Sequence, residues 1–226
     1  MKKSATLVLI DGNAVLHRAY HALPPLTTKS GQLVNAVYGF GSMLIRVVKE
    51  LKPEYLIVCF DRPKPTFRQS IYIGYQHKRP QMDEDLKGQI EMVHQLVSNM
   101  NIPIYEKDGF EADDVIGTLA TQATSHKIKN QKSKIKSTSE KSKLNNNIDV
   151  IIVTGDKDLF QLVNKKIKIY MMVKGLNESA LFSEKEIKEK YGIEPGQIID
   201  YKALIGDSSD NYAGVPGIGP KTAVDL

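Results

Sequence analysis

The chain has 226 residues, 41% of them hydrophobic, which is enough for one sizeable core and a small additional module. The apolar run Leu7 to Ile10 is closed at once by Asp11, so it is too short for a secretion signal, and nothing in the sequence resembles a membrane span. Residues 125–147 contain seven lysines and one glutamate, so this segment alone accounts for the net charge of +5. The remainder of the chain is nearly neutral. Net charge is therefore a poor predictor of nucleic-acid binding for this protein.

Short apolar runs alternate with segments of helical periodicity, a pattern typical of an α/β fold with a mainly parallel sheet. Strands are expected at residues 6–10, 55–60, 102–105, 148–153 and 167–173. Helices are expected at residues 37–51, 83–100, 111–123, 183–192 and 195–204. The single cysteine, Cys59, lies in the second strand, cannot form an internal disulfide and is expected to pack in the core.

The chain is expected to fold as two parts, an α/β domain of residues 1–175 and a smaller helical region of residues 176–226. Lys, Ser and Asn dominate residues 125–147, which carry too few apolar side chains to offset the entropy of ordering, so a disordered insertion is predicted there. The second part ends in a glycine-rich turn at 214–221 that leads into a helix. That helix has barely begun at Leu226, which predicts that the sequence is truncated.

Aspartates follow three of the predicted strands directly. Asp11 follows the first strand, Asp61 the second, and Asp156 and Asp158 the strand at 148–153. Because parallel strands end at the same edge of a sheet, where ligands bind, these four acids are expected to converge. A single aspartate in such a place is usually a turn residue or a helix cap, but three strands that end in this way favour a functional site.

Five further acids lie in two clusters. One cluster lies at the start of a predicted helix and consists of Glu111, Asp113 and Asp114. A negative charge at a helix N-terminus is favourable, which accounts for one of these acids. It does not account for three, because they repel one another. Asp207 and Asp210 lie in a polar loop, where a plain turn is the alternative. No histidine or cysteine stands at metal-ligand spacing among the nine acids, and oxygen ligands alone favour magnesium or manganese. Paired ions of this kind, about 3.5–4 Å apart, promote phosphate-ester cleavage.

These motifs together resemble a known family. They are Leu9-Ile10-Asp11-Gly12, Ala36-Val37-Tyr38-Gly39-Phe40, Phe60-Asp61, Phe110-Glu111-Ala112-Asp113-Asp114, Thr154-Gly155-Asp156-Lys157-Asp158-Leu159, Gly206-Asp207-Ser208-Ser209-Asp210-Asn211 and the terminal glycine turn. From end to end the chain resembles the bacterial 5′→3′ exonucleases, the amino-terminal domain of DNA polymerase I, which are related to the flap endonucleases.

The resemblance implies a PIN-like or resolvase-like fold, with a mainly parallel central sheet flanked by helices and a C-terminal helix-hairpin-helix module of the helix-3-turn-helix kind. It also implies two or more Mg²⁺ ions, replaceable by Mn²⁺, held directly or through water by Asp11, Asp61, Glu111, Asp113, Asp114, Asp156, Asp158, Asp207 and Asp210. The terminal turn would present Gly214, Gly217, Gly219 and Lys221 to duplex phosphates, with K⁺ as a further expected ion.

By the same likeness, residues 67–85 should form an arch over a single-stranded 5′ end, and Arg18, Arg68 and Arg79 should be catalytic residues that contact DNA phosphates or the scissile group. Phe67, Tyr72 and Tyr75 are expected either to stack on bases or to pack in the core. The chain departs from the family at Gln76, where the family usually has a lysine that supplies a cation to the transition-state phosphate. Either Lys78 partly substitutes for that lysine or turnover is slower.

The expected function is therefore metal-dependent 5′→3′ exonuclease and 5′-flap endonuclease cleavage of DNA, in primer removal and repair. The resemblance further implies a bacterial cytoplasmic, nucleoid-associated protein that acts as a monomer, or as part of a polypeptide that also carries a DNA polymerase. Two alternatives stay open, a PIN-type ribonuclease and a catalytically weak DNA-binding homologue. The glycine turn at 214–221 distinguishes the first alternative, and the complete set of acids argues against the second.

Overall fold

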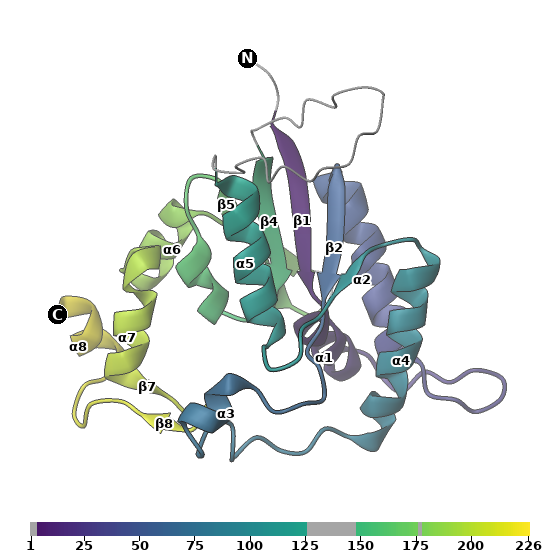
Figure 1. The fold of residues 1–226 in the computed structure, drawn as a ribbon, viewed down its shortest axis with the longest axis horizontal. Helices are drawn as coiled ribbons and strands as arrows, with labels where there is room; N and C mark the ends of the chain where they lie inside the picture. The colour runs from purple at the N-terminus through teal and green to yellow at the C-terminus, as the bar shows by residue number, and fades with distance from the viewer. Residues whose placement is uncertain (1–3, 126–147, 176–177) are drawn as a thin grey trace, which may run out of the picture.

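The structure is a computed structural model that describes residues 4–125, 148–175 and 178–226 (Figure 1). The predicted disordered insertion therefore lies, apart from Ser125, outside the described residues. Every helix in the described ranges is too short or too polar to cross a bilayer.

A six-stranded sheet of order β3-β2-β1-β4-β5-β6 is the centre of the described structure. Its strands are β1 (Ala5–Asp11), β2 (Tyr55–Cys59), β3 (Ile104–Tyr105), β4 (Ile148–Thr154), β5 (Ile167–Lys174) and β6 (Glu178–Phe182). The first five are parallel, as predicted, whereas β6 pairs antiparallel with β5 and was not predicted. β1 lies between β2 and β4. The next strands of the chain, β2 and β3, therefore lie on one side of β1, and the later strands β4, β5 and β6 lie on the other.

Alternating side chains of β1 divide the interior into two hydrophobic cores, one on each face of the sheet. Val8 and Ile10 face a core closed by α1 (Gly12–Ala22), α2 (Asn35–Leu51) and α4 (Glu84–Asn99). Leu7 and Leu9 face the other core, which α5 (Ala112–Thr124), the 3₁₀ helix η1 (Asp158–Leu162) and α6 (Glu184–Tyr191) close. Figure 1 shows α5 on the face opposite α2 and α4. Cys59 is fully buried among the residues of the second core, as predicted.

Local signals explain where the predicted helices end. Lys52 takes the left-handed conformation at the C-terminus of α2, and Pro53 follows. Ser183 and Glu186 form the capping box of α6, and Gly192 ends that helix with φ +76°. Two α-helices of the described residues were not predicted, α1 and the short α3 (Phe67–Ile71), nor was the 3₁₀ helix η1. Helix α1 begins directly at the end of β1, without an intervening loop, so no turn signal in the sequence marks its start.

The carboxy-terminal residues form a small helical unit beside the sheet. It contains the 3₁₀ helix η2 (Pro195–Gln197), α7 (Ile198–Ile205), the short strands β7 (Gly206–Asp207) and β8 (Tyr212–Ala213), and α8 (Pro220–Asp225). A Cβ atom on Gly206 would lie 2.3 Å from the nitrogen of Gly214, so both ends of the β7–β8 hairpin require glycine. Figure 1 places this hairpin next to α3, at the edge of the sheet where the parallel strands end.

Candidate active site

Asp11 lies at the centre of the strand edge. It is the last residue of β1 and the N-cap of α1, with Oδ1 accepting a hydrogen bond of 2.9 Å from the backbone N–H of Ala14. Its Oδ2 accepts from the hydroxyl of Thr154 at the end of β4, at 2.7 Å. Any side chain on Gly12 would clash with the ring of Phe60, so glycine here lets the chain turn from strand to helix at once. Asp11 is thus both a helix cap, the alternative that the sequence left open, and a carboxylate held in the site.

The neighbouring strands add Asp61 and Asp156. Asp61 follows β2, its backbone N–H donates to Oδ1 of Asn13 at 2.9 Å, and its own Oδ1 accepts from the N–H of Ala112 at 2.6 Å. Asp156 follows β4 and accepts from the backbone N–H of Asp158 at 2.8 Å. These backbone contacts fix both loops on the edge where Asp11 lies, as the parallel topology predicts.

The start of α5 supplies three more acids. Glu111 is the N-cap, and Asp113 and Asp114 lie in the first turn. Arg68 of α3 makes a bidentate ion pair with Asp114, with both N–O distances 2.7 Å, and reaches Glu111 at 3.4 Å. Burial raises the pKa of Asp114, but these hydrogen bonds outweigh burial and hold the pKa below its usual value. Asp114 is therefore already neutralised, whereas Asp113 has no such partner among the described residues.

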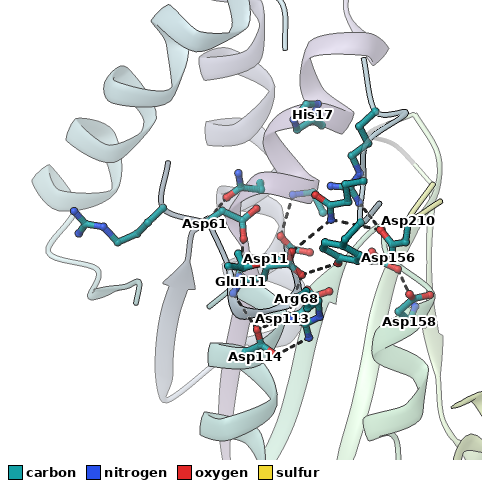
Figure 2. A pocket seen from close by; sticks show the side chains of 18 of the residues that line it. Asp11, His17, Asp61, Arg68, Glu111, Asp113, Asp114, Asp156, Asp158 and Asp210 are labelled. Atoms are coloured by element: carbon teal, nitrogen blue, oxygen red, sulfur yellow. Dashed lines mark hydrogen bonds and ion pairs between the residues drawn. The ribbon is translucent and has the colours of Figure 1, made fainter. Parts of the chain in front are cut away.

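Asp113 is the carboxylate of the site whose ionised form is most disfavoured. Burial raises its pKa to about 9, and the charges of the surrounding acids, Asp11 first, add to the shift. Burial also raises the pKa of Asp11 to about 6, against the two hydrogen bonds that its carboxylate accepts. Such a set repels itself when ionised, and a bound cation is the way to relieve that repulsion. Figure 2 shows Asp11, Asp61, Glu111, Asp113 and Asp156 gathered at the strand ends.

The remaining acids form a second group beside the first. Asp158, Asp207 and Asp210 each place a carboxylate oxygen within 4.8 Å of the others. Lys202 of α7 donates to both Asp158 and Asp207. Burial outweighs the lysine at Asp158 and raises its pKa, whereas at Asp207 the hydrogen bonds from Lys202 and Ser209 outweigh burial and hold the pKa at about 2.

The segment after α3 lies across both groups. The hydroxyl of Tyr75 donates to Glu111 at 3.1 Å, and the side-chain amide of Gln76 lies 3.4 Å from both Glu111 and Asp210. The hydroxyl of Tyr72 donates to the carbonyl of Asn211 in the β7–β8 loop at 2.7 Å. The predicted arch segment is therefore hydrogen-bonded to both acidic groups.

An open cleft of about 1630 Å³ passes over these residues, and a smaller one of about 650 Å³ adjoins it. Eight of the nine predicted acids line the larger cleft and Asp207 lines the smaller. Arg68, Tyr75, Gln76 and Arg79 line the larger cleft. Arg79 and Arg18 line the smaller, where Arg18 also donates to the carbonyl of Met172 at 2.9 Å.

Other residues predicted to contact DNA lie outside these two clefts. Lys78 is exposed and lines neither, so its position gives no support to a role in place of Gln76. Phe67 packs against Phe110 and beneath the guanidinium of Arg68. Tyr72 is 44% exposed. Gly214, Gly217 and Gly219 lie on the connection into α8 and Lys221 lies in its first turn, and none of the four lines either cleft.

Sequence reasoning missed four polar residues of the site. Thr154 positions Asp11, and Asn13 positions Asp61. Thr154 begins the motif that contains Asp156 and Asp158, in which only the acids were predicted to have a role. Half-buried His17 lines both clefts, and burial lowers its pKa. Lys202, five residues before Asp207 on a helix, has the sequence signature of an ordinary surface lysine, so only the structure reveals it.

The raised pKa of Asp113 predicts how stability depends on pH in protein treated with EDTA. The folded protein retains this proton above the ordinary aspartate value, near 4, so the free energy of unfolding should fall as pH rises from about 4 to about 9. Chemical denaturation at several pH values measures the free energy of unfolding of the unaltered protein and of Asp113→Asn. The value for the unaltered protein minus that for the variant should fall over this pH range. The control Asp108→Asn removes an exposed acid with a lowered pKa and should leave the fall intact. A flat difference profile would contradict the assignment of Asp113.

Two family models together match nearly the whole chain. The model described as 5′-3′ exonuclease, N-terminal resolvase-like domain, matches residues 6–192. The model described as 5′-3′ exonuclease, C-terminal SAM fold, matches residues 193–226 and so covers the glycine turn that distinguishes the chain from PIN-type ribonucleases. The predicted fold class is confirmed.

The chain is similar to curated proteins over its full length. It is 38% identical over 226 residues to DNA polymerase I of Bacillus subtilis, covering 100% of this chain but only 23% of that protein. It is 38% identical over 221 residues to a 5′-3′ exonuclease of Aquifex aeolicus, covering 98% of this chain and 68% of that protein.

Solved structures show the same fold at lower identity. The T5 D15 protein co-crystallised with metal ions has a TM-score of 0.68 and 19% identity, with 97% of this chain and 73% of that chain covered. The catalytic core of Rad2 in complex with DNA substrate has a TM-score of 0.57 and 16% identity, with 99% and 59% covered. With both family models in place, the chain belongs to the 5′-3′ exonuclease family.

Proposed function

We propose that this nuclease uses divalent cations to cut DNA phosphodiester bonds near 5′ ends and 5′ flaps. The observation that carries the proposal is the convergence of carboxylates from separate chain segments in one open cleft, where burial and, after it, mutual repulsion raise the pKa of Asp113. The donor set fits hard cations, because it offers carboxylate oxygens and no thiolate. The T5 D15 protein crystallised with metal ions and the Rad2 core crystallised with DNA support the same direction.

Two groups of acids would hold the ions. One ion would be held by the first group, which consists of Asp11, Asp61, Glu111, Asp113 and Asp156. Asp114 would act through Arg68 or water. Another ion would be held by the second group, which consists of Asp158, Asp207 and Asp210. Mg²⁺ is the proposed ion, with Mn²⁺ as a substitute, and when bound such ions supply water activation and charge stabilisation at the leaving oxygen. This chain's own contribution is to fix the acids with backbone hydrogen bonds and to line the cleft with Arg68 and Arg79, which orient the phosphate.

The remaining DNA contacts are proposed from position. Arg18 would bind a phosphate in the smaller cleft, and Phe67 and Tyr72 offer exposed rings on the arch segment for bases to stack on. The connection into α8 would present backbone N–H groups of Gly217 and Gly219 to a duplex phosphate, with Gly214 shaping the turn, Lys221 adding charge and K⁺ bound there.

The wider role rests on the relatives. Because several are DNA polymerase I, we propose primer removal and DNA repair in the bacterial cytoplasm at the nucleoid, with the domain acting as a monomer or fused to a polymerase. We also propose that residues 1–175 form the catalytic domain and 176–226 the DNA-gripping region. The family models divide the chain instead between residues 192 and 193.

The direct test uses a 5′-labelled DNA flap. We expect cutting near the flap junction with Mg²⁺ or Mn²⁺, no cutting in EDTA, and no cutting of single-stranded RNA of the same sequence. Gel analysis of the products checks this result. Preferential RNA cleavage would favour the PIN-type ribonuclease, and flap binding without cleavage at any Mg²⁺ concentration would favour the weak DNA-binding homologue.

A further inference from the structure

Lys202 occupies an unusual position for a lysine. Its ammonium donates to both Asp158 and Asp207, which come from η1 and from the β7–β8 hairpin. The lysine side chain is only 22% exposed, and those of the two acids are 29% and 12% exposed. A surface lysine gains little from holding such a geometry, whereas one enclosed by two carboxylates is a fixed local charge.

The ammonium lies where the second acidic group would bind a cation. Oxygens of Asp158, Asp207 and Asp210 are within 4.8 Å of one another, and two of these three residues already contact Lys202. The third, Asp210, lies 3.5 Å from Arg79 and 3.4 Å from the amide of Gln76. A divalent ion that uses these carboxylates must therefore compete with a positive charge of the chain itself.

The first acidic group is different. Asp11, Asp113 and Asp156 have no lysine or arginine paired with them among the described residues, so the charges of Asp11 and Asp156 act on Asp113 without a compensating cation of the chain. Cation binding there relieves repulsion, whereas cation binding at the second group has to break ion pairs. The two groups should therefore differ in affinity.

We propose that Lys202 is a built-in counter-ion that competes with the second divalent cation and sets its affinity. This inference rests on the proposed metal-dependent function. Lys202 acts through the ligands Asp158 and Asp207 and is therefore a positioning residue. In the absence of a second ion it keeps these acids close together, and when the ion binds, the ammonium moves away from the carboxylates that the ion takes over.

Direct measurement of Mn²⁺ binding tests the proposal without reference to cleavage. Electron paramagnetic resonance of free Mn²⁺ should give two classes of site in the unaltered protein. In Lys202→Met the weaker class should tighten by at least about tenfold, because the competing charge is gone, while the tighter class stays unchanged. Lys202→Arg keeps the charge and should bind the second ion weakly. Lys157→Met, which removes an exposed lysine from the same cleft, controls for long-range charge.

A double variant locates the effect. Adding Asp207→Asn to Lys202→Met removes a ligand of the second group and should cancel the gain. Thermal unfolding followed with and without Mn²⁺ confirms that each variant is folded, and Lys202→Gln serves if Lys202→Met is not. An unchanged or weaker second site in a folded Lys202 variant, or an equal gain in Lys157→Met, would overturn the inference and leave the proposed function standing. Absence of Mn²⁺ binding in every protein would overturn both.

Discussion

Replacing Asp113 with asparagine should reduce flap cleavage at saturating Mg²⁺ by at least about a thousandfold, the scale expected when a central electrostatic group is lost. The amide keeps the shape of the side chain but removes the negative charge that is surrounded by the other acids of the first group. The same change should stabilise the protein in EDTA at neutral pH by about 1–3 kcal/mol, because Asp113 has to take up a proton to be buried there whereas asparagine does not. Single-turnover cleavage and chemical denaturation measure the two effects.

The matched control is the next residue along the chain. Asp114 carries the same side chain on the same helical turn but is paired with Arg68 through both oxygens. Asp114→Asn should therefore destabilise the protein, since it leaves the guanidinium without its partner. Opposite signs of the stability change at these neighbouring positions would support the electrostatic account of the site. If Asp113→Asn lowers stability in EDTA, or retains cleavage, Asp113 does not have the role proposed for it.

This opposition explains why the acids were predictable from the sequence as a group but not individually. Aspartates at the ends of parallel strands converge for topological reasons, so Asp11, Asp61 and Asp156 followed from strand periodicity alone. The sequence carries no sign that Asp113 faces the other acids while Asp114 faces Arg68, because that depends on where α3 packs. A five-residue helix has too short a periodic pattern to be recognised in the sequence.

The same limit applies to the fold. The predicted parallel strands are present because each is a compact apolar run. The antiparallel strand β6, of sequence Glu-Ser-Ala-Leu-Phe, has no β-branched residue and only two large apolar ones, so it was not predicted although Gly175 and Asn177 before it favour a hairpin turn. Helix α1 follows β1 without a break, so a strand ending and a helix cap share one residue, Asp11.

Gln76 lies between the two acidic groups. Its backbone has φ +55°, its N–H donates to the carbonyl of Asp210 at 3.2 Å, and its amide nitrogen lies 3.4 Å from oxygens of Glu111 and Asp210. These contacts are long for hydrogen bonds and are made by a neutral donor. The backbone, however, already places this side chain where a cation would contact both acids.

Gln76→Lys should therefore raise the single-turnover rate of flap cleavage by about tenfold, since a charge-assisted contact to the transition-state phosphate replaces a neutral one. The gain should appear in the rate at saturating enzyme and Mg²⁺ more than in the affinity for the flap. Gln76→Met, which has a similar length and no donor, should not show it, and Lys78→Gln should have little effect because Lys78 lies outside the clefts. An unchanged or slower Gln76→Lys enzyme would mean that Glu111 and Asp210 sequester the new ammonium, as Asp158 and Asp207 hold Lys202, and that Gln76 does not limit the rate.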